Sequence, residues 1–95
     1  MWPVTVRPRA EADLQNARYW YEERREGLGR EFITAARLAV EKIRANPERY
    51  PVYYRGFRRV LLTRFPYKLF YRVEGERIII FRALHFRQDH TRHLK

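Results

Sequence analysis

Apolar residues in the first half of the chain recur at the spacing of an α-helix. From Arg9 to about Glu26 they follow one another at intervals of four, three and four residues, at Ala10, Leu14, Ala17 and Tyr21. This pattern predicts an amphipathic helix. Pro8 suits the first turn of that helix, where its missing N–H costs nothing.

A second amphipathic helix is predicted from about Arg30 to Ala45. Its apolar face comprises Phe32, Ala36, Ala39 and Ile43, widened by Ala35 and Val40. Asn46-Pro47 ends this helix, because the residue before a proline avoids the helical region. The link Gly27-Leu28-Gly29 stops the first helix and is short enough to force the two helices into a hairpin.

In the second half the pattern changes to that of β-strands. Three strands are predicted at about Phe57–Arg64, Tyr67–Val73 and Glu76–Phe86, the last two joined by a tight turn at Glu74-Gly75. Residues 47–56 form a loop, and Val4-Thr5-Val6 forms a short edge strand. The expected order is β-α-α-β-β-β. This is an α+β fold in which the helical hairpin packs on one face of a mostly antiparallel four-stranded sheet, and residues 1–95 make a single domain.

Alternation along the last two strands separates their side chains into two faces. A turn at Glu74-Gly75 pairs Tyr71 with Ile78 and Leu69 with Ile80. The face under the helices then comprises Leu69, Tyr71, Val73, Ile78, Ile80 and Leu84. The opposite face comprises Lys68, Phe70, Arg72, Arg77, Ile79, Phe81, Ala83, His85 and Arg87. This mixture of aromatic and cationic residues suits a groove that receives phosphates and stacked bases.

Most of the positive charge lies in the same half of the chain. Residues 51–95 hold 11 Lys and Arg against 3 Asp and Glu, a net charge of +8, whereas residues 1–50 hold 10 against 8, a net charge of +2. Such cations bind nucleic acid by releasing counterions from its phosphates. They also bind an acidic protein that neutralises them. Composition alone leaves both classes of partner open.

Composition excludes several other functions. The chain has no cysteine, which rules out disulfides, thiolate metal ligands and a Cys nucleophile. The longest apolar run is the four residues from Ile78 to Phe81, far below the roughly 20 residues of a membrane span, and the N-terminus lacks the apolar core of a signal peptide. We therefore expect a soluble, cytoplasmic protein that does not enter the membrane.

Lys68, His85 and Arg87 are the candidate catalytic residues, and Arg58 and Arg64 on the neighbouring strand could converge with them. Cleavage of an RNA phosphodiester requires a base, an acid and positive charge at the phosphate, which these side chains supply. Their spacing is not a specific signature. A histidine at the end of a strand is more often a half-exposed residue that makes one backbone hydrogen bond.

The histidines of the C-terminal segment do not indicate a metal site. His85, His90 and His93, with Asp89 as a fourth ligand, match no structural zinc pattern. We interpret this segment as a frayed, positively charged tail, and we expect no metal and no cofactor.

Several motifs are spread over nearly the whole chain. They are Ala12-Asp13-Leu14, Trp20-Tyr21-Glu22, Gly27-Leu28-Gly29 with Phe32, the run from Ile43 to Pro51, Arg58-Arg59, the run from Arg64 to Tyr71, and Ala83-Leu84-His85 with Arg87 and Asp89. In these motifs the chain resembles the RelE/ParE superfamily of toxins from type II toxin–antitoxin systems, often labelled plasmid stabilization proteins. The resemblance implies a helical hairpin on a mostly antiparallel sheet, the same order as the one derived above.

The resemblance implies one of two activities. RelE-like members are mRNA interferases that cut mRNA in the ribosomal A site; by this resemblance Lys68 serves the phosphate and Arg87 lies near the scissile group. The aromatic residue that stacks a base in that branch lies in the C-terminal tail, and here Thr91 to Lys95 offer none. The long hairpin and the sequence Arg64-Phe65-Pro66-Tyr67 look more like the ParE-like branch, whose members poison DNA gyrase without catalytic chemistry.

We therefore expect a type II toxin that binds an essential target, DNA gyrase first among the candidates. The residues expected to bind this target or a phosphate are Arg58, Arg59, Arg64, Tyr71 and Arg72. A cognate acidic antitoxin is expected to neutralise the toxin by wrapping its C-terminal segment around it in a hetero-oligomer. Two alternatives stay open, a ribosome-dependent mRNA endoribonuclease that uses Lys68, His85 and Arg87, and a degenerate, non-toxic binding module.

Overall fold

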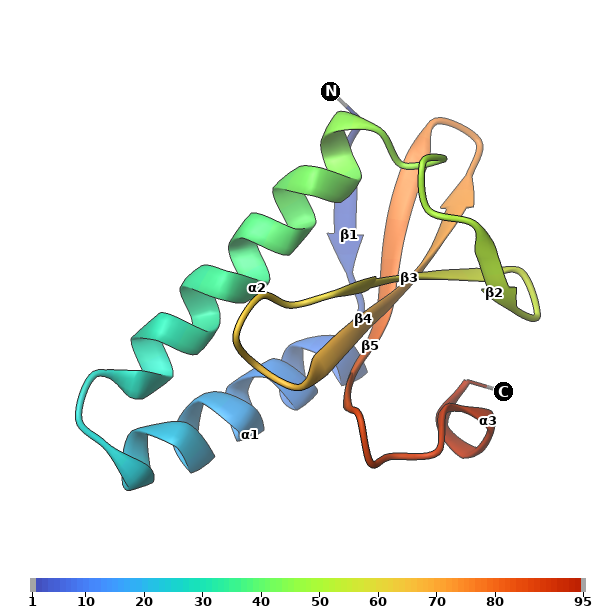
Figure 1. Ribbon diagram of the computed structural model, residues 1–95. Helices are drawn as coiled ribbons and strands as arrows, with labels where there is room; N and C mark the ends of the chain where they lie inside the picture. Colours follow the sequence, from blue (N-terminus) through green and yellow to red (C-terminus); the bar gives the residue numbers. More distant parts are fainter. Residues whose placement is uncertain (1, 95) are drawn as a thin grey trace.

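Two long helices and a five-stranded sheet form the main layers of the computed structural model, which describes residues 2–94 (Figure 1). The elements in chain order are β1 (Val4–Val6), α1 (Pro8–Arg24), α2 (Leu28–Ala45), β2 (Val52–Tyr54), β3 (Phe57–Leu61), β4 (Tyr67–Glu74), β5 (Arg77–His85) and α3 (His90–His93). Across the sheet the order is β1-β5-β4-β3-β2, with β1 parallel to β5 and the other pairs antiparallel. The predicted α+β fold and its order are confirmed, with β2 and α3 as additions.

The turn between α1 and α2 is closed by Glu22. Its carboxylate accepts hydrogen bonds from the N–H groups of Gly27 and Gly29, both at 3.0 Å. These two bonds hold the pKa of Glu22 below its usual range. Gly29 also lies against α1, because a Cβ at this position would come within 2.7 Å of the Arg18 carbonyl oxygen. The hairpin therefore depends on a small residue at the start of α2.

Replacing Gly29 with alanine is expected to lower the free energy of unfolding by about 1–2 kcal/mol. The added methyl group forces the helices apart, and this overpacking outweighs the better helix propensity of alanine. Chemical denaturation measures the loss. Thr34→Ala, at an exposed position of the same helix, serves as the control and should stay within about 0.5 kcal/mol of the parent. Equal stability of the parent and Gly29→Ala would contradict the close approach.

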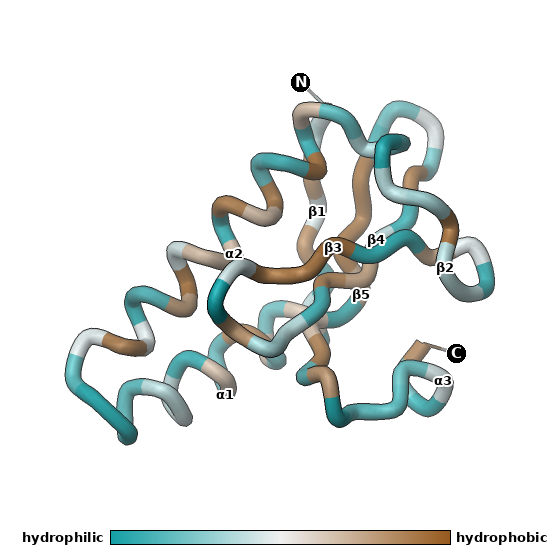
Figure 2. The backbone as a smooth tube through the Cα atoms, viewed as in Figure 1, coloured by the Kyte–Doolittle hydropathy of each residue, from teal (hydrophilic) through white to brown (hydrophobic). Residues whose placement is uncertain are grey.

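The main hydrophobic core lies between the two long helices and the sheet. At its centre the ring of Phe32 from α2 meets three other rings, with centroids 5.3 Å from Tyr21, 5.3 Å from Phe65 and 5.1 Å from Tyr67. Figure 2 shows apolar residues recurring along α2 and running along the central strands, as amphipathic packing requires. The Tyr21 ring stacks on that of Phe32, whereas Phe65 and Tyr67 meet it edge-to-face. Aromatic pairs such as these add about 0.5–1.5 kcal/mol each beyond the burial of area.

A β-bulge in β5 changes which side chains face the helices. Tyr71 pairs with Ile80, but its neighbour Phe70 pairs with Arg82, so Phe81 is an extra residue in β5. A bulge inverts the alternation of the strand beyond it. Ile80 therefore belongs to the core under the helices, whereas Leu84 packs into a second apolar cluster. The prediction that Leu84 faces the helices is wrong, because alternation alone does not reveal a bulge.

The turn that joins β4 and β5 also differs from the prediction. Glu74 pairs with Arg77, so the two turn residues are Gly75 and Glu76. Gly75 has φ of 64°, the left-handed conformation that glycine adopts without strain. Relative to the predicted pairing the register shifts by two residues. Because a shift of two preserves alternation, the predicted faces are correct on the turn side of the bulge.

The C-terminal segment folds back onto the face of the sheet opposite the long helices. Asp89 caps α3 by accepting hydrogen bonds from the backbone N–H and the hydroxyl of Thr91, at 3.0 and 2.7 Å. The side chain of Leu94 is buried in the second apolar cluster, together with Phe57, Phe70 and Leu84. The prediction of a frayed tail is therefore wrong as far as Leu94, and Lys95 lies outside the described residues.

Candidate functional site

The sheet separates the two central residues of the predicted catalytic group. Lys68 lies on the same face as Phe70, with its Nζ 5.6 Å from the Phe70 ring centroid. His85 lies on the face toward the helices, where its ring is 5.2 Å from that of Tyr67. The bulge at Phe81 is the cause, since it inverts the alternation of β5 before His85. The predicted convergence of Lys68 and His85 is therefore wrong.

Lys68 is a buried cation without a recorded counter-charge. Only 8% of this residue is exposed, and burial, followed by the nearby charge of Arg59, lowers the pKa of its ammonium group. Every ion pair recorded within residues 2–94 uses an arginine as its cation, so none involves Lys68. A buried and unpaired ammonium group attracts an anionic group from a partner.

Two arginines on the same face as Lys68 stack on aromatic rings. The guanidinium of Arg59 lies 3.8 Å from the ring centroid of Tyr53. That of Arg72 lies 4.1 Å from the ring centroid of Phe57 and donates to the Arg55 carbonyl at 2.9 Å. Its Nε is buried without a partner. We call Arg59, Lys68 and Arg72 the Lys68 surface, a group of cations held by aromatic residues.

Three further residues predicted to bind the target make hydrogen bonds within the chain. Arg58 donates to the backbone carbonyls of Glu48 and Tyr50, which fixes the loop after α2. Arg64 pairs with Glu31 at 2.9 Å and stays largely exposed. Tyr71 is completely buried, and its hydroxyl donates to the Pro47 carbonyl at 2.7 Å. Tyr71 is thus inaccessible to a partner, and its prediction as a binding residue is wrong.

The burial of Tyr71 predicts a loss of stability in alkali. Burial raises the pKa of its hydroxyl from 10.0 to about 12, so the folded state holds this proton between these values while the unfolded state releases it. The free energy of unfolding should fall as the pH rises from about 10 to 12. In Tyr71→Phe the free energy of unfolding should be about 1 kcal/mol lower at neutral pH. It should then fall less than that of the parent between pH 10 and 12. Urea unfolding at several pH values tests this, with the exposed Tyr53→Phe as control. Equal declines in parent and Tyr71→Phe would contradict it.

The end of β5 fixes the orientation of His85. Its Nδ1 accepts a hydrogen bond from the backbone N–H of Arg87 at 3.0 Å, and its own backbone N–H donates to Oε1 of Gln88 at 2.8 Å. A neutral imidazole that accepts at Nδ1 carries its proton on Nε2. The expectation of a half-exposed histidine with a backbone hydrogen bond is confirmed, and the described contacts of Arg87 involve only its backbone.

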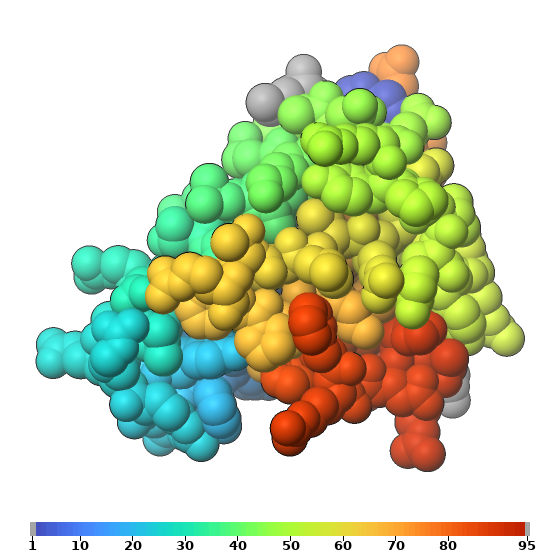
Figure 3. All heavy atoms as spheres, in the orientation of Figure 1, coloured from blue at the N-terminus to red at the C-terminus, as the bar shows by residue number. Residues whose placement is uncertain are grey.

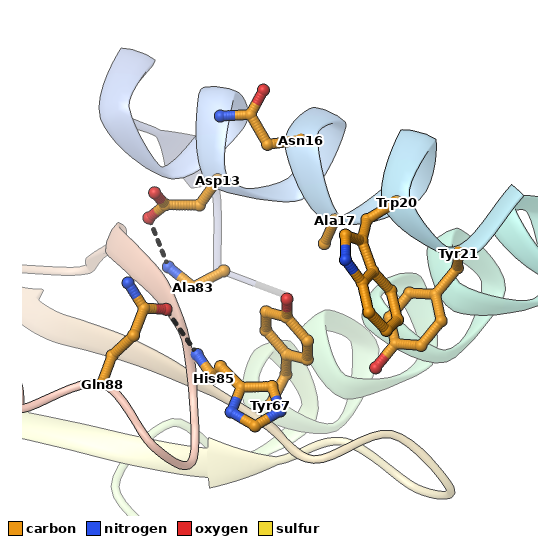
Figure 4. Close-up of a pocket in the computed structure, with 9 residues that line it drawn as sticks. All are labelled: Asp13, Asn16, Ala17, Trp20, Tyr21, Tyr67, Ala83, His85 and Gln88. Atoms are coloured by element: carbon orange, nitrogen blue, oxygen red, sulfur yellow. Dashed lines mark hydrogen bonds between the residues drawn. The ribbon is translucent and has the colours of Figure 1, made fainter. Parts of the chain in front are cut away.

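A pocket of about 390 Å³ lies between α1 and the end of β5 (Figure 4). It is lined by Asp13, Asn16, Ala17, Trp20, Tyr21, Tyr67, Ala83, His85 and Gln88. In Figure 4 Trp20 and Tyr21 extend from α1 toward the sheet, the amide of Asn16 points away from it, and the ring of Tyr67 rises from the sheet toward α1. The sequence offered no signal for this pocket, because its walls come from segments far apart in the chain.

Asp13 ties α1 to the wall of that pocket. Its carboxylate accepts two hydrogen bonds from the guanidinium of Arg82, at 2.7 and 2.9 Å, and one from the backbone N–H of Ala83 at 2.9 Å. The partner strand β1 ends opposite Ile80, so this carboxylate satisfies an N–H that would otherwise lie at an open sheet edge. The bond to Asp13 raises the pKa of Arg82 above its ordinary value.

An apolar groove of about 460 Å³ runs between α2 and the connection from β3 to β4. Its lining includes Ala35, Leu38, Ala39, Leu61 and Phe65, with Glu31, Glu41, Lys42 and Arg64 among its charged residues. Leu38 and Leu61 are 58% and 49% exposed. Figure 3 shows this part of the surface, where the side chains of residues 61–65 (yellow) lie beside those of α2 (green). Exposed apolar side chains that gather in a groove are typical of a peptide-binding site.

Within residues 2–94 no group of three or more His, Cys, Asp or Glu side chains is placed to hold a metal ion. No helix in the same range is long and apolar enough to cross a membrane.

Comparison with known protein families gives a match that spans residues 4–90. It is to the family described as the ParE toxin of the type II toxin–antitoxin system parDE. The chain belongs to the ParE toxin family. This match confirms the predicted resemblance and agrees with the ParE-like branch.

A solved structure shares the fold of this ParE-family chain. It is a chain of the chromosomal ParDE toxin–antitoxin system from P. aeruginosa, 24% identical in sequence, with a TM-score of 0.67. The similarity covers 90% of this chain and 96% of that chain. No curated protein matches the sequence.

Proposed function

We propose that this ParE-family chain is a toxin that inhibits growth by binding an essential target, DNA gyrase, without catalysing a reaction. The observation that carries the proposal is the position of Lys68 and His85 on opposite faces of the sheet. General acid–base cleavage requires both groups within reach of one phosphate. Their separation supports binding over the alternative of RNA cleavage by Lys68, His85 and Arg87.

The Lys68 surface is the proposed contact with the target. Arg59 and Arg72 hold their guanidinium groups against aromatic rings, which reduces the side-chain entropy lost on binding. Lys68 adds a desolvated positive charge, and an exposed Arg64 extends the charge toward the groove. These cations fit acidic side chains of a protein target or the phosphates of DNA held by it.

The apolar groove is the proposed site of the antitoxin. An antitoxin segment with apolar anchors would bury the exposed parts of Leu38 and Leu61. Carboxylates beside those anchors would approach Lys42 at the groove. Binding there is compatible with neutralisation, since the β3 residue Leu61 in the groove lies two positions from Arg59 of the Lys68 surface.

Supercoiling of relaxed plasmid by purified gyrase tests the target. The purified chain is expected to inhibit supercoiling in a concentration-dependent manner, and addition of the antitoxin should restore it. Relaxation by an ATP-independent type I topoisomerase provides the control and should not change. Full supercoiling at a large molar excess of the chain would overturn the gyrase assignment.

A parallel experiment on translating ribosomes separates the enzymatic alternative. Under the proposal mRNA stays intact when the chain is added. Cut transcripts that disappear in Lys68→Gln would establish the ribonuclease instead. If induced expression leaves growth, supercoiling and mRNA unaffected, the chain is a non-toxic binding module.

A further inference from the structure

The pocket between α1 and β5 is chemically unlike the rest of this basic chain. The sequence contains 21 Lys and Arg residues, yet none of them lines this pocket. Its only carboxylate, Asp13, is already bound to Arg82 and Ala83. A pocket without free charge on its walls selects a neutral ligand group rather than an anion.

The polar groups that remain in the pocket are both donors and acceptors. Within residues 2–94 no hydrogen bond is recorded for the indole N–H of Trp20 or the hydroxyl of Tyr67. His85 accepts at Nδ1 from Arg87, so its Nε2–H remains as a donor. The hydroxyl of Tyr67 is protonated at neutral pH, as that of any ordinary tyrosine is, and burial raises its pKa further.

The same walls provide flat aromatic surfaces for stacking. Trp20 is 49% exposed and meets Tyr21 edge-to-face, with 5.0 Å between ring centroids. Tyr67 and His85 form a second edge-to-face pair, and Figure 4 shows both rings at the base of the pocket, below α1. A planar ligand that stacks on such rings and hydrogen-bonds along its edge fits this arrangement. The volume of about 390 Å³ is in the range of small-ligand sites.

Besides Arg82, which Asp13 already binds, a second cation stands beside the pocket rather than in its lining. The guanidinium of Arg24 lies 3.7 Å from the ring centroid of Trp20, and the only hydrogen bond recorded for it within the described residues goes to the Trp20 carbonyl. It is exposed to solvent. A ligand whose planar part enters the pocket can therefore extend a negatively charged group toward Arg24.

We propose that this pocket binds a nucleobase, and that the phosphate attached to it pairs with Arg24. Tyr67 recognises the polar edge of the base while Trp20 stacks on it. The base comes from a free nucleotide or from an unpaired position in a nucleic-acid strand. This site is separate from the Lys68 surface and does not require gyrase to be the target.

Tryptophan fluorescence tests the proposal directly. The chain has two tryptophans, so in a Trp2→Phe background all of the tryptophan fluorescence comes from Trp20. A base that stacks on Trp20 should quench this fluorescence. Adenosine, adenosine monophosphate and a single-stranded mixed-sequence oligonucleotide are the probes. Saturable quenching by adenosine and tighter binding of the monophosphate are expected. If the oligonucleotide binds at least tenfold more tightly than the monophosphate, the source is a strand, and otherwise it is a free nucleotide.

Variants then assign the contacts. Tyr67→Phe should weaken adenosine binding about fivefold, the effect of one lost hydrogen bond, with circular dichroism confirming that the variant folds. Tyr19→Phe, on an exposed part of α1 outside the pocket, is the matched control and should bind normally. Arg24→Gln should abolish the advantage of the monophosphate and leave adenosine binding unchanged.

Three results would overturn the site. The first is the absence of saturable quenching by any probe. The second is displacement of adenosine monophosphate by ribose 5-phosphate at equal concentration, which would indicate an anion patch. The third is displacement by N-acetylphenylalaninamide at a tenfold lower concentration than adenosine, which would assign the pocket to a protein side chain.

Discussion

Replacing Asp13 with alanine is expected to lower the free energy of unfolding by about 3–5 kcal/mol. The pair that Asp13 forms with Arg82 is shielded, with the side chains only 16% and 10% exposed. Without the carboxylate, the guanidinium of Arg82 remains buried beside His93 and loses the two oxygen atoms that accept its hydrogen bonds. The backbone N–H of Ala83 loses its acceptor as well. Chemical denaturation at neutral pH measures the combined cost.

Two further variants separate charge from packing. Glu41→Ala removes an exposed ion pair to Arg44 and should cost no more than about 0.5 kcal/mol. Asp13→Ala combined with Arg82→Met should recover much of the lost stability, because no buried charge remains without a partner. A loss below about 1 kcal/mol in Asp13→Ala would mean that water solvates the pair as it does a surface ion pair.

Leu38→Asp is expected to weaken antitoxin binding by about 30-fold or more. Under the proposed function Leu38 is an anchor position of the groove, and a carboxylate there would be desolvated by the antitoxin without a partner. Truncation or disruption of a central anchor costs about 2 kcal/mol or more, equivalent to that change in affinity. Titration calorimetry with the antitoxin measures it. In cells the antitoxin should then fail to neutralise the variant, while its action on the target is unchanged.

Val52→Asp is the matched control for the groove. Val52 is an exposed apolar residue in β2, outside the groove lining, and the substitution makes the same change of charge. Its affinity for the antitoxin should stay near that of the parent. If Val52→Asp weakens binding and Leu38→Asp does not, the antitoxin lies across β2 and the groove is free.

Local features of the sequence were sufficient for the helical hairpin. The spacing of apolar residues in α1 and α2 follows from helix geometry, and Pro8, Gly27 and Asn46-Pro47 mark the ends within about two residues. The strands β3, β4 and β5 were predicted from the pattern of β-strands in the second half of the chain. β2 was missed because Val52–Tyr54 is three residues long, too short for a reliable alternating pattern. The tail was misread because the burial of Leu94 depends on Phe57 and Phe70, far from it in the sequence.

The candidate site depended on contacts that local patterns do not encode. The Asp13–Arg82 pair joins residues 69 positions apart, and neither residue is distinguishable from a surface charge in the sequence. Tyr71 was predicted both as a core residue and as a binding residue. Its buried hydrogen bond to the Pro47 carbonyl places it in the core. Arg58 looked like a phosphate ligand, but its carbonyl partners lie in the loop after α2.

The sequence by itself determined the element order, the asymmetric positive charge and the resemblance to the ParE family, because these follow from spacing, composition and motifs. Only the tertiary structure decided which side chains meet. One extra residue at Phe81 placed His85 beside Tyr67 and away from Lys68. The physical reason is that a β-strand alternates with a period of two. A single inserted residue therefore exchanges its faces, and that insertion depends on pairing with another strand.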